Sequence, residues 1–128
     1  MRRWLPLLAV ALAGCGGSPG DLLSIEVKGG PAQRNQSIVV RSDGQGSCNG
    51  GPSKDIGSDA LIDARTIERE LTEDAERAAF YESPRGEATN YVARTNDGTV
   101  RWQEGAPDLP PVLARAQLFA LQQGRALC

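Results

Sequence analysis

The side chains that most often perform catalysis are sparse in this chain of 128 residues. No histidine is present, so the sequence lacks the usual general base and the usual neutral metal ligand. Serine-hydrolase and cysteine-protease triads are excluded for the same reason. The remaining candidates for acid and base work are the carboxylates of one segment, Glu68, Glu70, Glu73, Asp74 and Glu76. Carboxylates on an amphipathic helix are typical of a solvated face, and we expect a protein that is not an enzyme.

Two further patterns resemble binding sites, and one common binding motif is missing. Residues 43–47 read Asp-Gly-Gln-Gly-Ser, which resembles the start of a calcium loop but lacks its later acidic ligands, so a turn explains them better. No glycine-rich run has the lysine spacing of a phosphate-binding loop. Tyr91 and Trp102 offer an aromatic platform, yet aromatic residues on the buried side of a hairpin usually belong to the core. We expect no cofactor, no catalytic residue and no metal ligand.

The N-terminus has the features of an export signal. Two arginines precede the apolar residues 4–13, and small residues follow them. Such a run is too short to span a bilayer. Leu12-Ala13-Gly14-Cys15 resembles the lipobox, the site at which bacterial lipoproteins are lipidated and cleaved. The resemblance implies that Cys15 becomes the first mature residue and carries acyl chains such as palmitate.

The lipobox divides the chain into three parts. Residues 1–14 are the expected lipoprotein signal peptide, residues 15–21 the lipidated cysteine and a flexible tether, and residues 22–128 a single domain. The expected location is the bacterial cell membrane or the outer membrane, with the protein lipid-anchored and outside the cytoplasm. The alternative is an ordinary secretory signal whose cysteine follows the cleavage point by chance.

Lipidation of Cys15 leaves one pair of cysteines, Cys48 and Cys128. Outside the cytosol such a pair is expected to form a disulfide. The bridge would close a loop of about eighty residues, which the chain-entropy model values at roughly 4 kcal/mol. Two free thiols, or a zinc site completed by carboxylates, are the alternatives.

The charge of the mature chain argues against nucleic acid as a partner. Without the two arginines of the signal it carries twelve basic and sixteen acidic side chains, a formal charge of −4. Nucleic-acid-binding proteins concentrate positive charge on one face, and no basic cluster is present. The expected partners are the membrane, through Cys15, and an envelope or secreted protein.

Apolar periodicity predicts the first elements of the domain. Leu23, Ile25 and Val27 alternate with polar residues, which predicts a strand with one buried face, and residues 37–41 are expected to form a second strand. The glycine-rich segment 42–58 is predicted to be irregular and to be held in place by the disulfide.

A helix is expected to follow, beginning at Ser58 or Asp59 and stopping before Ser83-Pro84. Thr72 is a candidate point at which it breaks into two pieces. Its expected buried residues share one arc at 100° per residue, and they are Leu61, Ala64, Ile67, Leu71, Ala75 and Ala78.

A hairpin and a final helix complete the domain. The Asp-Gly pair at 97–98 lies between residues 88–95 and 99–104 and predicts a type I′ turn with Ala93 opposite Trp102. The residues expected on the buried face of this hairpin are Tyr91, Ala93, Val100 and Trp102.

The final helix is expected to open at Asp108-Leu109-Pro110-Pro111 and to close at Gly124, leaving residues 125–128 to reach the bridge. Its expected buried residues are Leu109, Val112, Leu113, Ala116, Phe119 and Ala120. The predicted order is β-β-α-β-β-α. We therefore expect an α+β fold in which two helices cover one face of a four-stranded antiparallel sheet.

Three segments carry a resemblance to a known family. They are Ile25-Glu26-Val27-Lys28-Gly29-Gly30, the hairpin with Val100 and Trp102, and Ala106-Pro107-Asp108-Leu109-Pro110-Pro111-Val112-Leu113. The layout resembles the emfourin family, which are small inhibitors of thermolysin-type metalloproteases. The resemblance implies an α+β fold and a stoichiometric inhibitor without catalytic residues. The chain departs from the family pattern in its lipobox, in the glycine-rich loop around Cys48 and in Cys128, and no inhibitory residue is assigned.

Two function hypotheses follow. The first is a lipid-anchored, non-catalytic protein-binding module of the cell envelope, with metalloprotease inhibition as a candidate activity and the loops 29–36 or 42–58 as the contact surface. The second is a structural or assembly lipoprotein of the envelope that inhibits nothing. A rigid loop held by the disulfide favours the first hypothesis, and a disordered loop favours the second.

Overall fold

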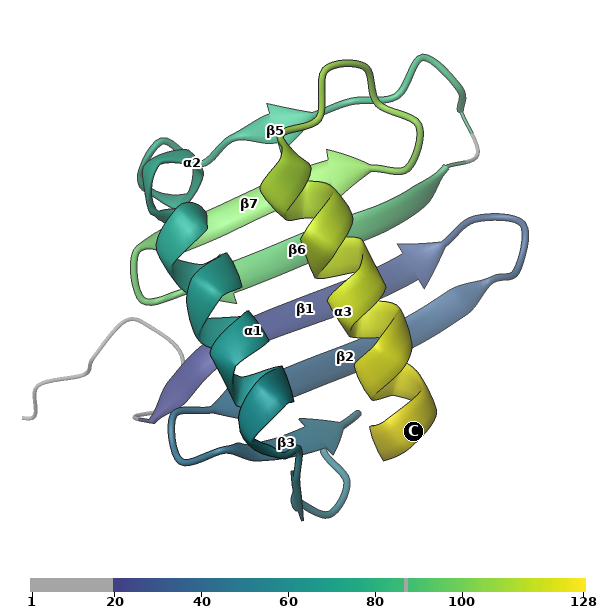
Figure 1. Ribbon diagram of the computed structural model, residues 1–128. Helices are drawn as coiled ribbons and strands as arrows, with labels where there is room; N and C mark the ends of the chain where they lie inside the picture. Colours follow the sequence, from purple (N-terminus) through teal and green to yellow (C-terminus); the bar gives the residue numbers. More distant parts are fainter. Residues whose placement is uncertain (1–19, 87) are drawn as a thin grey trace, which may run out of the picture.

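The computed structural model describes residues 20–86 and 88–128. The signal peptide, Cys15 and most of the expected tether therefore lie outside the described residues. The described part is an α+β domain in which a mixed sheet carries its helices on one face (Figure 1). The α+β class expected from the sequence is confirmed.

The strands of the described part are β1 (Asp21–Gly29), β2 (Arg34–Arg41), β3 (Gln45–Cys48), β4 (Lys54–Asp55), β5 (Phe80–Tyr81), β6 (Thr89–Thr95) and β7 (Gly98–Gln103). The helices of the described part are α1 (Ser58–Glu70), α2 (Thr72–Glu76) and α3 (Pro111–Leu127). The strand order in the sheet is β4-β3-β2-β1-β6-β7-β5, and every pairing is antiparallel except that of β5 with β7.

The core lies between the sheet and the helices. Alternate residues of β1 face the helices, so Leu23, Ile25 and Val27 are buried as the alternation predicted. In Figure 1, α1 and α3 lie side by side across the front of the sheet, and α2 lies beside β7. Their contributions to the core include Ala64, Ile67, Leu71, Ala75, Val112, Leu113, Ala116, Phe119 and Ala120.

The expected four-stranded sheet is wrong, because the described sheet has seven strands. Two of the additional strands, β3 and β4, lie in the glycine-rich segment that was expected to be irregular. Gly46 faces the helix layer, where an added Cβ would lie 2.7 Å from Ile56 Cγ2 and 2.9 Å from Leu127 Cδ1. A strand passes here because glycine leaves room for these two side chains.

The third additional strand, β5, follows the helix that was expected to continue to residue 78. Leu71 separates α1 from α2, one residue before the break predicted at Thr72. The chain then leaves the helical path at Ala78, which has φ of 50° and is exposed rather than buried. Phe80 and Tyr81 pair in parallel with β7 at the edge of the sheet.

The second hairpin has the predicted buried face but a different register. Tyr91 lies opposite Trp102, and Ala93 opposite Val100, so Asn96 and Asp97 occupy the turn. Shifting the register by an even number of residues keeps the same side chains on the buried face. Neither turn residue has positive φ, so the predicted type I′ turn is wrong.

Gly98 begins β7 instead of sitting at the centre of the turn. It has φ of 142°, and an added Cβ would collide with the carbonyl oxygen of Ala75 in α2. Glycine is needed here for the close approach of α2 as well as for its backbone conformation.

The last helix is longer than expected. α3 continues through Gly124 to Leu127, so the prediction that Gly124 ends it is wrong. Gly124 is buried beside β2, and an added Cβ would lie 3.0 Å from Gln36 Oε1. The glycine therefore allows close packing, and the helix itself carries the chain to Cys128.

Candidate functional site

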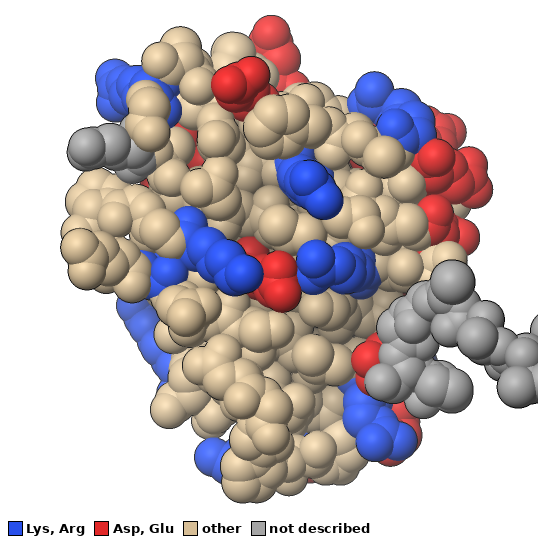
Figure 2. All heavy atoms as spheres, turned by 180° about the vertical axis from the view of Figure 1, so that it is seen from behind, with Lys and Arg blue, Asp and Glu red and all other residues tan. Residues whose placement is uncertain are grey.

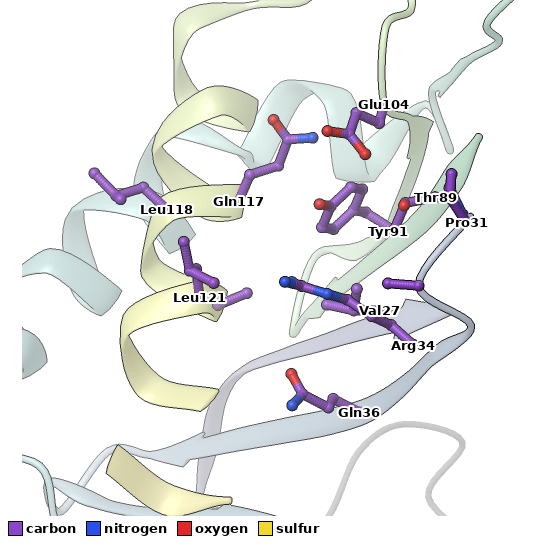
Figure 3. A pocket seen from close by; sticks show the side chains of 12 residues that line it. Val27, Pro31, Arg34, Gln36, Thr89, Tyr91, Glu104, Gln117, Leu118 and Leu121 are labelled. Carbon is purple, nitrogen blue, oxygen red and sulfur yellow. The ribbon is translucent and has the colours of Figure 1, made fainter. Parts of the chain in front are cut away.

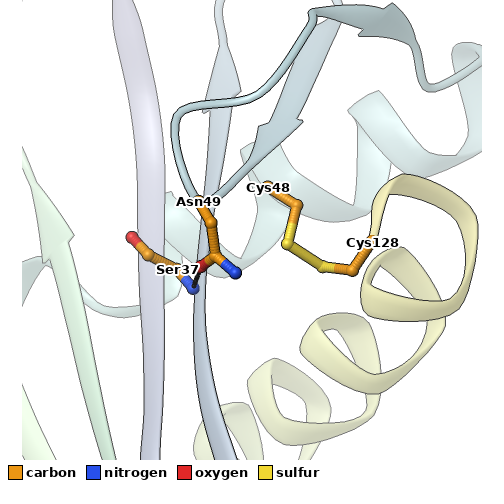
Figure 4. The surroundings of a disulfide bond; sticks show 4 residues. All are labelled: Ser37, Cys48, Asn49 and Cys128. Carbon is orange, nitrogen blue, oxygen red and sulfur yellow. Dashed lines mark hydrogen bonds between the residues drawn. A yellow bond between two sulfur atoms is a disulfide. The ribbon is translucent and has the colours of Figure 1, made fainter.

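The disulfide joins β3, the second strand from one edge of the sheet, to the end of α3. Cys48 and Cys128 are bonded, with an S–S distance of 1.96 Å and a Cα–Cα distance of 5.4 Å, which is the pairing expected from the sequence. Figure 4 shows the bridge with Ser37 and Asn49 beside it. The backbone amide of Ser37 donates to Asn49 Oδ1 at 2.8 Å, and the backbone amide of Asn49 donates to the Ser37 carbonyl oxygen at 2.8 Å.

These contacts fix the backbone of the segment that was expected to form a loop. The amide of Gly51 donates to the Cys48 carbonyl oxygen at 2.9 Å, and the amide of Ile56 donates to the Gly44 carbonyl oxygen at 3.0 Å. Residues 49–55 are nevertheless exposed. We call residues 49–55 the bridged loop, because their backbone is held by the disulfide and the sheet while their side chains face solvent.

The other loop expected at a binding surface, residues 29–36, is a tight turn between β1 and β2. The amide of Gln33 donates to the Gly30 carbonyl oxygen at 3.0 Å. Gly30 has φ of 74°, and an added Cβ would collide with Thr89 Oγ1. The hairpin end is thus held against β6, and only residues 30–33 form the turn itself.

A cavity of about 400 Å³ lies between this hairpin end and α3 (Figure 3). Its polar lining consists of Arg34, Gln36, Thr89, Tyr91, Glu104 and Gln117. Its apolar lining consists of Val27, Pro31, Ala32, Leu118, Ala120 and Leu121. It combines both signs of charge, neutral hydrogen-bonding groups and an apolar wall, the mixture typical of a ligand site.

A second hollow of about 240 Å³ continues the first along α3. The two share Arg34, Gln36 and Leu121, and the second adds Gly124 and Arg125. We call the two together the α3 groove. Glu104 lines only the first hollow and Arg125 only the second, so the groove is acidic toward one end and basic toward the other.

Tyr91 forms part of the floor of the groove and is also a core residue. Its ring stacks on Trp102, with centroids 5.2 Å apart and the planes 8° from parallel. The Trp102 side chain is 1% exposed, and its Nε1 has no hydrogen-bond partner among the described residues. The pair was predicted to belong to the core, and both side chains are buried.

The surroundings of the Tyr91 hydroxyl raise its pKa and so favour the protonated form. Burial raises the pKa of Tyr91, and the Glu104 carboxylate raises it further, while the Arg34 guanidinium and the neighbouring Gln117 amide lower the pKa. A neutral phenol can donate a hydrogen bond into the groove.

The charged groups of the groove take part in none of the ion pairs within residues 20–86 and 88–128. Those pairs are Arg41–Asp43, Arg77–Asp74, Arg94–Glu26 and Arg115–Glu70. Arg34 and Arg125 are both exposed. A ligand that carries negative charge can therefore approach them without breaking any of these pairs.

Sequence reasoning did not identify the groove, although one signal of it is present in the sequence. Arg34 and Gln36 have the same parity as the buried Ile38 and Val40 of β2, which places them on the helix side of the sheet. Gln117 similarly falls on the buried arc of α3, four residues after Leu113. Polar residues at positions that face a core are a signal of a site at its border.

The uncovered face of the sheet is a second surface, and Figure 2 shows it from behind. Charged side chains are scattered over a mainly uncharged surface, and Arg94 Nη1 lies 3.2 Å from Glu26 Oε2. A hollow of about 340 Å³ at the β5 edge is lined by Ala78, Phe80, Thr99 and Arg101. Phe80 is 56% exposed.

Two of the five acidic candidates for catalysis, Glu70 and Asp74, make structural contacts. Both carboxylate oxygens of Glu70 accept from Arg115 Nη1, at 3.2 and 3.1 Å, which links α1 to α3. Asp74 accepts from Arg77 and from the hydroxyl of Tyr81. Within the described ranges no three or more acidic or cysteine side chains are grouped so as to hold a metal ion.

The segment that resembled a calcium loop, residues 43–47, covers the end of the turn between β2 and β3 and the start of β3. The backbone amide of Gln45 donates to Asp43 Oδ1 at 3.1 Å. This carboxylate therefore supports the local turn, as the turn interpretation of the sequence proposed.

No helix in the described ranges is both long enough and apolar enough to cross a membrane. Comparison of the chain with protein-family models, with curated proteins and with solved structures finds no match.

Proposed function

We propose that this protein is a lipid-anchored lipoprotein of the bacterial cell envelope that acts as a non-catalytic protein-binding module. The observation that carries the proposal is the bridged loop, an exposed segment whose backbone is fixed by the Cys48–Cys128 disulfide and by the hydrogen bonds between Ser37 and Asn49. A surface that is already ordered loses less conformational entropy when it binds a partner. Metalloprotease inhibition is the candidate activity.

The position of the first strand fits a lipid anchor at Cys15. β1 begins at Asp21, six residues beyond that cysteine. Six extended residues span about 20 Å, so the anchor would hold the domain close to the lipid surface. A module placed there would meet envelope proteins and secreted proteins that pass the membrane.

Inhibition of a metalloprotease requires an exposed segment that resists distortion when the enzyme binds it. Two segments meet this requirement, the turn at residues 30–33 and the bridged loop. The emfourin-like segment 25–30 leads into the first of them. The alternative function, a structural or assembly lipoprotein without inhibitory activity, uses the same anchor but gives the fixed loop no role.

The anchor is tested by expressing the full chain and its Cys15→Ser variant in a bacterium that is supplied with labelled palmitate. The label and the protein are expected together in the membrane fraction for the unaltered chain, and neither is expected there for the variant. Membrane association that survives Cys15→Ser would contradict the lipid anchor.

The activity is tested by titrating a thermolysin-type protease with the full chain, using casein as substrate. Stoichiometric inhibition that is lost in the Cys48→Ala/Cys128→Ala variant would support the inhibitor and give the bridged loop a role. Slow digestion of the chain without inhibition would exclude this activity for that protease class.

Binding is tested independently of inhibition by photo-crosslinking in the expressing bacterium. A benzophenone group at Ser53 in the bridged loop is compared with one at Arg69, which is exposed on α1. A protein crosslinked from position 53 and not from position 69 supports the binding module. Equal or absent crosslinking at both positions favours the structural lipoprotein.

A further inference from the structure

We propose that the α3 groove binds a short extended peptide segment that carries a carboxylate, and that Arg34 is the group that holds this carboxylate. The inference deepens the proposed protein-binding function and rests on it. It adds a second contact surface, separate from the bridged loop. It also names the chemistry of the partner segment that would bind there.

The dimensions of the groove suit a peptide of few residues. Its lining on α3 runs from Gln117 to Arg125. Eight residues of α-helix rise about 12 Å, which matches about three to four residues of an extended chain. The two hollows share Arg34, so the guanidinium lies at the middle of this length.

The charges select the sign of the ligand. Two guanidinium groups, those of Arg34 and Arg125, line the groove, while Glu104 is the one carboxylate among its described lining residues. A guanidinium binds a carboxylate through two parallel hydrogen bonds. Figure 3 shows the Arg34 side chain extending from β2 toward α3, where it can present this fork to a ligand.

The neutral polar groups suit the peptide backbone. The amides of Gln36 and Gln117 can each donate to a carbonyl oxygen and accept from an N–H, and the hydroxyls of Thr89 and Tyr91 add two donors. These groups line the same cavity as Arg34. A simple inorganic anion would use the guanidinium and leave the amides unused.

The apolar wall suits one side chain next to the carboxylate. Leu118 is 53% exposed and Leu121 is partly buried, and both line the first hollow with Pro31. An acyl chain would use this wall but would leave the polar groups on the other side desolvated and unpaired. The mixture of groups therefore favours a peptide.

The test uses the full-length protein, purified in detergent and immobilised, with mixtures of N-acetylated tetrapeptides. One mixture has Asp at a fixed position and an amidated C-terminus. A second has Asn at that position and an amidated C-terminus, and a third has the same Asn and a free C-terminus. Retained peptides are quantified by mass spectrometry, and the first and third mixtures distinguish a side-chain carboxylate from a terminal one.

The first or the third mixture is expected to be retained about tenfold better than the second, which has no carboxylate. The reason is that each hydrogen bond to a charged group contributes strongly to the binding free energy. Arg34→Gln is expected to abolish this difference. Arg101→Gln is the matched control, since Arg101 is an exposed arginine on the opposite face of the sheet and is expected to retain the peptides as the unaltered protein does. Denaturant unfolding of both variants verifies that they fold.

Three results would overturn the proposal. They are equal retention of all three mixtures, retention of the carboxylate mixtures by Arg34→Gln that equals that of the unaltered protein, and no retention of any mixture. Its failure is distinguishable from failure of the proposed function. A partner crosslinked from Ser53 together with no retained peptide removes the groove and keeps the binding module.

Discussion

Tyr91 belongs both to the hydrophobic core and to the α3 groove. Its ring is stacked on Trp102, while its hydroxyl lies in the field of Glu104 and Arg34. Burial is the largest cause of its raised pKa, so the folded protein favours the neutral phenol. A free tyrosine has a pKa of about 10, and the folded chain resists ionisation above that value.

The expected consequence is a loss of stability at alkaline pH that Tyr91→Phe reduces. The contribution of the neutral phenol is fully present below about pH 10 and is lost as the pH rises through the folded pKa of Tyr91. Phenylalanine does not titrate, so the free energy of unfolding of the variant should fall less steeply above pH 10. Urea unfolding at a series of pH values measures this.

Tyr81 serves as the comparison, because burial and a hydrogen bond to Asp74 also raise its pKa. Tyr81→Phe should remove its own share of the pH dependence and leave that of Tyr91 in place. Identical pH profiles for the unaltered protein and Tyr91→Phe would show that this phenol does not resist ionisation.

At the scale of elements, α3 shows how packing overrides a local signal. Glycine near the end of an apolar periodic stretch is typical of a helix terminus, yet Gly124 lies within α3. The helix continues because its apolar face packs on β2 and β3 and because its last residues lead to the disulfide. Here Gly124 has a helical conformation and needs no positive φ.

Gly124→Ala is therefore expected to stabilise the protein. Alanine is favoured over glycine inside a helix by about 0.8–1 kcal/mol, and the group it would meet is the end of the Gln36 side chain, 3.0 Å from the added Cβ. That flexible side chain can move by a few tenths of an ångström. The expected gain in the free energy of unfolding is up to about 1 kcal/mol, measured by urea denaturation.

Gly98→Ala is the informative control, because Gly98 has positive φ and faces the fixed backbone of Ala75. It is expected to lower stability by about 1–3 kcal/mol. If Gly124→Ala were as destabilising as Gly98→Ala, Gln36 would be held rigidly and the proposed accommodation would be wrong.

At the scale of the whole molecule, the disulfide ties β3, next to the edge strand β4, to the end of α3. Cys48 and Cys128 are 80 residues apart in sequence. The bridge restricts the unfolded chain, and a loop of this length corresponds to about 4 kcal/mol in the chain-entropy model. It also holds the bridged loop that carries the proposed function.

The Cys48→Ala/Cys128→Ala variant is expected to lose about 4 kcal/mol of unfolding free energy. Urea unfolding of the full chain measures this, and adding a reductant to the unaltered protein should reproduce the loss. The Cys15→Ser variant is the control, since its remaining cysteines can still form the bridge. Unfolding midpoints that do not change on reduction would show that the bridge does not stabilise the fold.

The sequence by itself determined the elements whose signal is local and periodic. The alternation of Leu23, Ile25 and Val27 predicted β1 and its buried face, and the apolar arcs predicted most of α1 and α3. The sequence also predicted the buried face of the second hairpin, because the observed strand register differs from the predicted one by an even number of residues. The cysteine count, combined with the lipobox resemblance, predicted the disulfide partners.

Only the tertiary structure decided the short elements and the groove. β3 and β5 have weak strand signals of their own, and they exist because β2 and β7 offer them unpaired backbone groups. The α3 groove combines residues of β2, β6 and α3 with Glu104, which are distant in sequence. Periodicity reports which side of an element is buried, but a site formed where several elements meet depends on how they pack.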